Sequence, residues 1–231
     1  MNWLLRRKYL TLLVSLLLLI VVYPTLRDVF ETRLLFDVLF TLVFLGCLLA
    51  LFPDRSSRVL GFLLGTPTVV GLWSGYVLPG LPRPPMVVAF HLAGALFLTL
   101  VVVSILRTIS REKKVTADGV HGAFCGYVLL GLIFGHLFTV LETLAPGTFR
   151  MSVPVTATFL NEDRFYFLLT YFSFITLTTV GYGDVTPISH AARGLVVVEA
   201  IIGQFYLVVL MAELIGKRVS QALAEQHSEP S

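Results

Sequence analysis

Charged residues are scarce in this chain of 231 residues: Asp, Glu, Lys and Arg make up 13% of it, whereas hydrophobic residues make up 56%. The mean hydropathy is +0.87. Soluble globular domains of this size do not have such a composition, which indicates a membrane protein. The net charge is only +3, and since it reflects the basic loops of a membrane topology, nucleic-acid binding is not expected.

Cysteine is rare as well. The two cysteines, Cys47 and Cys125, each lie within an apolar stretch, so we expect buried small side chains rather than a disulfide or a metal site. The sequence also lacks a nucleophile–base pair and metal-ligand spacings such as H-E-x-x-H. Neither an enzyme nor a bound cofactor is therefore predicted.

Long apolar stretches are abundant. Crossing a bilayer takes roughly 20 mainly apolar residues, and six stretches meet this requirement. They lie near 9–26, 34–52, 59–78, 86–107, 119–144 and 190–216. A seventh, about 164–178, is too short and too polar to span.

The basic residues predict the orientation. With the N-terminus inside, eleven of the 17 Lys and Arg residues fall on the inner side, and both termini are cytoplasmic. The basic start and Leu-rich run resemble a signal peptide, but no small-x-small cleavage site follows Tyr23-Pro24, so we expect this segment to be retained. The plasma (inner) membrane is the expected location.

Residues 179–183 read Thr-Val-Gly-Tyr-Gly. A dehydrated K⁺ needs a shell of oxygens, which backbone carbonyls supply if all point to one side. That arrangement requires left-handed backbone at alternate residues, and Gly181 and Gly183 permit it. The Thr179 hydroxyl adds an oxygen at the inner end.

This pentapeptide is the selectivity-filter sequence of potassium channels, and residues from about 119 to 216 resemble the pore module of that family. We call Thr179, Val180, Gly181, Tyr182 and Gly183 the filter segment, and the resemblance implies that they coordinate K⁺. One chain carries one such segment, so a closed ring implies a homotetramer.

The resemblance implies an all-α integral membrane protein with six transmembrane helices, a re-entrant pore helix and the filter. We divide the chain into a peripheral helical domain (1–110), a pore domain (111–219) and a short cytoplasmic tail (220–231). The pore helix is expected to begin at Glu162-Asp163, where acidic groups suit the first turn. Its aromatic residues are expected to wedge the loop against its neighbours: Phe165, Tyr166, Phe167, Tyr171, Phe172 and Phe174.

Asp184 stands where the family has its outer-mouth aspartate. Where the family usually has paired tryptophans, this chain has Tyr171 and Phe172. We expect Tyr171 to donate a hydrogen bond to Asp184. Because Phe172 has no donor, Tyr182 would depend on Thr176 or water.

Two carboxyl groups lie within the last apolar stretch, where a charge is costly. Glu213 is four residues before Lys217, the spacing of a helical ion pair. Glu199 has no basic partner at helical spacing. We expect it to support the filter through a hydrogen bond to Thr176 or Thr178.

The last apolar stretch has one glycine near its middle, Gly203. It is either a hinge or a site of close helix packing. The resemblance places Gln204, Leu207 and Met211 on the water-filled cavity. They share one helix face, and a ring of Met211 side chains would narrow the inner mouth.

The fourth apolar stretch lacks the basic residues of a voltage sensor, since none precedes Arg107 and His91 is its only ionisable group. Steep voltage dependence is therefore not expected. Three alternatives are left for the stimulus that opens the channel: membrane lipid, pH and an unknown regulatory partner. His121 and His190 are the candidates for a response to pH.

These observations predict a potassium-selective channel that is not opened by a charged voltage sensor. Two alternatives stay open: a weakly selective cation channel, and a non-conducting subunit or sensor that uses the pore fold for assembly.

Overall fold

The computed structural model describes residues 8–27, 33–51, 55–77, 84–112, 114–151 and 162–226. Nearly all of them are helical. The helices are α2 (Lys8–Arg27), α3 (Arg33–Leu51), α4 (Arg55–Val77), α5 (Pro84–Arg111), α6 (Ala117–Leu144), α7 (Glu162–Leu177) and α8 (His190–Gln226). All seven apolar stretches of the sequence are thus helices, and α7 begins at the predicted residue.

Three described helices, α5, α6 and α8, are long and apolar enough to cross a membrane. The chain is therefore an all-α membrane protein. The count of six spans stays a prediction, because the apolar portions described for α2, α3 and α4 are shorter.

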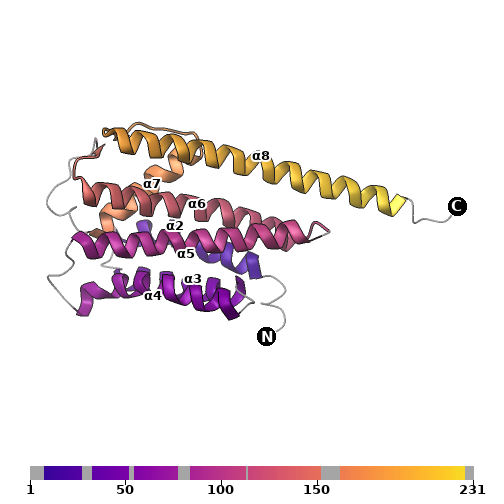
Figure 1. The fold of residues 1–231 in the computed structure, drawn as a ribbon, viewed down its shortest axis with the longest axis horizontal. Coiled ribbons are helices and arrows are strands. Elements are labelled where there is room, and N and C mark those ends of the chain that lie inside the picture. The colour runs from indigo at the N-terminus through magenta and orange to yellow at the C-terminus, as the bar shows by residue number, and fades with distance from the viewer. Residues whose placement is uncertain are drawn as a thin grey trace.

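The helices form a bundle in which α6 lies between the peripheral helices and α8 (Figure 1). The α5 and α6 helices run antiparallel along most of their length, α4 packs on α5, and α2 packs on both α3 and α6. The α8 helix extends well beyond the rest of the bundle, at the end where α6 begins. The link between α7 and α8 lies at the opposite end.

The start of α2 is held by α6. The Asp118 carboxylate, in the first turn of α6, accepts hydrogen bonds from the backbone amides of Tyr9 (3.2 Å) and Leu10 (3.4 Å). A carboxylate at a helix N-terminus satisfies free amides and suits the helix dipole. Tyr9 is buried and its carbonyl accepts a bond from the Cys125 thiol. Cys47 and Cys125 are both buried and free, as predicted.

Two glycines let α7 approach α6 closely. A Cβ atom on Gly131 would lie 2.4 Å from the Phe174 ring, and one on Gly135 would lie 2.4 Å from the Thr170 hydroxyl. A side chain at Gly135 would also come within 3.0 Å of the Thr170 Cα atom and push the α7 backbone away, whereas one at Gly131 would displace the Phe174 ring. Because α7 leads directly into the filter segment, this contact fixes the depth at which that segment sits.

The α8 helix is the least covered of the three long helices, since only 17% of its most apolar window is buried, against 72% for α6. Large apolar side chains are exposed along it: Val197, Val198, Ile201, Ile202, Phe205, Val208, Val209, Met211 and Ile215. This apolar face has no partner within the described part of the chain.

Candidate functional site

The filter segment follows α7 with an alternating backbone. Thr179, Gly181 and Gly183 have φ values of 61°, 56° and 79°. The left-handed backbone predicted at both glycines is confirmed. Thr179 completes the alternation, and it is the only non-glycine residue with positive φ in the described ranges. A β-branched residue adopts this conformation at a cost of about 1–3 kcal/mol, so its surroundings must hold it there.

Carbonyl groups at the end of α7 hold the filter segment in this conformation. The Ile175 carbonyl accepts hydrogen bonds from the amides of Val180 (2.9 Å) and Gly181 (3.2 Å), and the Thr176 carbonyl accepts one from Thr179 (2.9 Å). These amides point back at the helix end. The first half of the filter segment is thereby pinned to α7 by its own backbone.

The residues after the filter segment are held by a second set of contacts. The Tyr171 hydroxyl donates to the Asp184 carboxylate at 2.9 Å, which confirms the predicted bond. Strand β2 (Val185–Pro187) then pairs antiparallel with β1 (Phe149–Met151). These short strands were not expected from the sequence pattern. They tie the outgoing chain to the segment that follows α6.

Two aromatic residues of α7 are buried within the chain. Phe172 is 5% exposed, with ring centroids 5.4 Å from Phe138 and 5.5 Å from Phe149 of the same chain. Tyr166 is also buried within the chain. These two side chains therefore pack within their own chain, and the role of the aromatic residues as wedges of the loop against its neighbours stays a prediction.

The Tyr182 side chain is 73% exposed in the single chain. Within the described residues of this one chain no hydrogen bond joins it to Thr176, and the reliance of the Tyr182 hydroxyl on Thr176 or water stays a prediction. The Thr178 hydroxyl, just after the end of α7, donates to the Phe174 carbonyl of that helix at 2.7 Å.

Glu199 lies against α7, as expected, but with another partner. Its side chain is fully buried and accepts a hydrogen bond from the Ser173 hydroxyl. The predicted partners, Thr176 and Thr178, are wrong. Ser173 also lies 2.8 Å from the Gly131 carbonyl. Ser173 therefore joins all three helices of the predicted pore domain: α6, α7 and α8.

Gly203 lies where α8 crosses the end of α7. A Cβ atom there would lie 3.1 Å from the Leu177 side chain, and α8 continues through this residue as a helix. Of the two alternatives, close packing describes its surroundings. Gln204, Leu207 and Met211 are exposed in the single chain.

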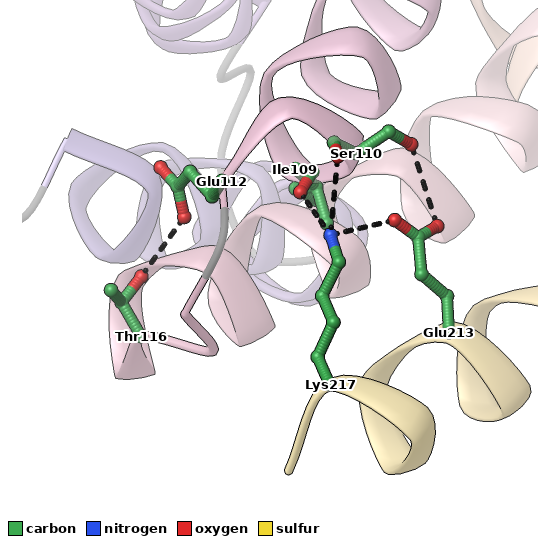
Figure 2. Close-up of polar contacts among 6 residues, drawn as sticks. All are labelled: Ile109, Ser110, Glu112, Thr116, Glu213 and Lys217. Carbon is green, nitrogen blue, oxygen red and sulfur yellow. Dashed lines mark hydrogen bonds and ion pairs between the residues drawn. The ribbon is translucent and has the colours of Figure 1, made fainter. Parts of the chain in front are cut away.

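The far part of α8 is attached to α5 (Figure 2). Lys217 and Glu213 form the predicted ion pair at 2.8 Å. The Lys217 ammonium also donates to the carbonyls of Ile109 (2.7 Å) and Ser110 (3.4 Å), in the last turn of α5. The Ser110 hydroxyl in turn donates to Glu213. The helical spacing predicted the ion pair, but not its hydrogen bonds to α5.

A polar cluster of two buried residues, His136 and Tyr166, and the half-buried His91 links α5, α6 and α7. The Nδ1 atoms of His91 and His136 are 2.8 Å apart, and His136 Nε2 lies 3.2 Å from the Tyr166 hydroxyl. His91 stood out in the sequence as the only ionisable group of its apolar stretch, whereas no sequence pattern pointed to His136. The two histidines proposed for pH sensing lie elsewhere: His121 is the fifth residue of α6, and His190 is the first residue of α8.

Residues 126–220 match a family model described as an ion channel. The match begins within α6 and includes α7, the filter segment and most of α8. It supports an ion channel family and passive ion conduction. The comparisons found no match among the curated proteins and none among the solved structures.

Proposed function

We propose that this chain forms a homotetrameric, potassium-selective channel. The alternation of left-handed backbone at Thr179, Gly181 and Gly183 carries the proposal. Such a backbone directs successive carbonyls to one side, where they replace the water shell of K⁺. The Thr179 hydroxyl adds the innermost oxygen, and ions at adjacent sites repel one another and keep moving.

The uncovered face of α8 supports the tetramer. Each chain carries one filter segment, so a ring of carbonyls needs several chains around an axis. In the proposed assembly the exposed apolar side chains of α8 pack against neighbouring chains and line the inner half of the pore. Gln204, Leu207 and Met211 face the cavity on this proposal, with Met211 nearest the inner mouth.

The proposed support for the filter comes from two sides. At the outer end, the Tyr171–Asp184 bond and the β1–β2 pairing fix the chain. At the back, Glu199 and Ser173 fix α7 against α8. In the proposed orientation both termini are cytoplasmic, in the plasma membrane, and the filter opens outward.

The test is K⁺ and Na⁺ flux through the purified chain in liposomes, measured beside Gly181→Ala. The substitution places a side chain at φ 56°, which should distort the filter segment and abolish K⁺-selective flux. Gly46→Ala is the matched control, because nothing lies within 4 Å of a Cβ at that helical position.

The outcomes separate the alternatives. K⁺-selective flux in the parent chain and in Gly46→Ala, lost in Gly181→Ala, supports the proposal. Equal passage of K⁺ and Na⁺ favours a weakly selective cation channel. Silence from a verified tetramer at varied pH and lipid composition favours the non-conducting subunit or a missing activator.

A further inference from the structure

We propose that Tyr127 is a positioning residue for the filter segment, acting from α6 on the last carbonyl of α7. The inference rests on the proposed potassium-channel function. It adds to the selectivity machinery a residue outside α7, the filter segment and α8.

Each of the last four carbonyl groups of α7 accepts a hydrogen bond. An α-helix leaves its last four carbonyls without partners inside the helix. Three of those in α7 accept backbone amides from the residues that follow: Phe174 from Thr178 (3.0 Å), Ile175 from Val180 (2.9 Å) and Gly181 (3.2 Å), and Thr176 from Thr179 (2.9 Å). The fourth carbonyl, that of Leu177, accepts its hydrogen bond from the Tyr127 hydroxyl at 2.9 Å.

Close packing around the Leu177 carbonyl favours Tyr127 as its hydrogen-bond donor. The Leu177 side chain is fully buried and fits against Gly203 of α8. The Tyr127 ring lies beside that of Tyr206, with centroids 6.0 Å apart, and the Tyr206 hydroxyl donates to the Ala123 carbonyl. Tyr127 is thus seated among α6, α7 and α8.

The Leu177 carbonyl can affect the filter segment because it lies just before that segment in the chain. Leu177 is two residues before Thr179, whose backbone is already in a costly left-handed conformation. If the Leu177 peptide rotates, Thr179 turns with it, and its carbonyl and hydroxyl leave the inner end of the proposed ion path. Discrimination between K⁺ and Na⁺ depends on the number and placement of these oxygens.

The test compares Tyr127→Phe with Tyr206→Phe in the full-length chain in liposomes. Each substitution removes one hydroxyl that donates to a backbone carbonyl of another helix, but the Tyr127 bond joins α6 to α7 whereas the Tyr206 bond joins α8 to α6. The measured quantity is the K⁺/Na⁺ permeability ratio from reversal potentials, with thermal stability recorded alongside. We expect Tyr127→Phe to lower the ratio roughly threefold to tenfold, the equilibrium equivalent of one hydrogen bond, and Tyr206→Phe to leave it unchanged.

An unchanged ratio in Tyr127→Phe, or an equal fall in both variants, overturns the inference, because packing alone would then explain the contact. If Tyr127→Phe does not assemble, the test uses Tyr127→4-aminophenylalanine, whose amino group replaces the hydroxyl as donor. A K⁺-selective channel from this variant supports the positioning role of Tyr127, and a channel that has lost K⁺ selectivity overturns it. A parent chain that does not select K⁺ refutes the proposed function itself, so the two failures are distinguishable.

Discussion

The Lys217 ammonium of α8 lies 2.7 Å from the Ile109 carbonyl oxygen in the last turn of α5. The free carbonyls of a helix C-terminus carry partial negative charge and attract a cation. Together with Glu213 they surround Lys217 on several sides (Figure 2). The far part of α8 is thus attached to a peripheral helix of its own chain.

Removing this charge should loosen α8 from α5. We expect Lys217→Met to lower the thermal midpoint of the purified protein by roughly 3–12 °C, because hydrogen bonds from charged groups contribute about 1.5–3 kcal/mol. Glu213→Gln should have a smaller effect, since the α5 carbonyls still hold the ammonium. The measurement is thermal unfolding in detergent.

The control for Lys217 is Arg218→Gln, which removes the same charge from an exposed neighbour. It should leave the midpoint within about 1 °C, since surface charges contribute little. Equal midpoints for Lys217→Met and Arg218→Gln would mean that the anchorage to α5 contributes nothing to stability.

A second prediction concerns the contact between α6 and α7. A Cβ on Gly135 would lie 2.4 Å from the Thr170 hydroxyl and 3.0 Å from its Cα atom, which is backbone and cannot move aside alone. Gly135→Ala should therefore destabilise the protein by about 1–3 kcal/mol. Gly46→Ala, with open space around it, should be neutral. Equal thermal stability of the two variants would disprove the tight contact.

A third prediction concerns Glu199 and Ser173, which are in direct contact. Glu199→Leu removes the acceptor and Ser173→Ala removes the donor, so the double variant should lose less stability than the sum of the single variants. We expect a coupling of about 1 kcal/mol. Glu199→Gln should stay near the parent protein, because its amide oxygen still accepts from Ser173. Strictly additive losses would remove the proposed support of α7 by Glu199.

The helices were predictable because each reflects a local pattern. Apolar stretches follow from the thickness of a bilayer, and the observed helices begin and end within a few residues of them, except that α8 continues to Gln226. The left-handed positions Gly181 and Gly183 were predictable because glycine adopts positive φ at little cost. The Tyr171–Asp184 bond came from the resemblance and not from any local pattern.

The partners of the site were less predictable, because they depend on how separate helices pack. Tyr127 and Leu177 are 50 residues apart, and His91 and His136 are 45 apart. Glu199 was assigned to the correct helix but to the wrong residue, since the choice between Ser173 and its neighbours depends on the rotation of α7. One signal was present: Gly131 and Gly135 are four residues apart and mark the face of α6 that receives α7.

A final prediction concerns voltage. Each elementary charge that crosses the membrane field contributes about 2.3 kcal/mol per 100 mV. The α5 helix carries no Lys or Arg between Pro84 and Leu106, and its two arginines lie in its last turns. Arg107 and Arg111 therefore lie close to the end of the helix, where they would cross little of the field. With no charge deeper in α5, opening should depend only weakly on potential.

We therefore expect the steady-state conductance to change less than about tenfold over 100 mV, which corresponds to roughly 1.4 kcal/mol and less than one charge. The measurement is the macroscopic K⁺ current across a planar bilayer in symmetrical solutions. Introducing a basic residue in the middle of α5, as Leu96→Arg at an exposed position, gives a comparison with an added charge. If the parent channel already responds more than about 100-fold over the same range, more than one charge must move in the field. The expectation of weak voltage dependence would then be wrong.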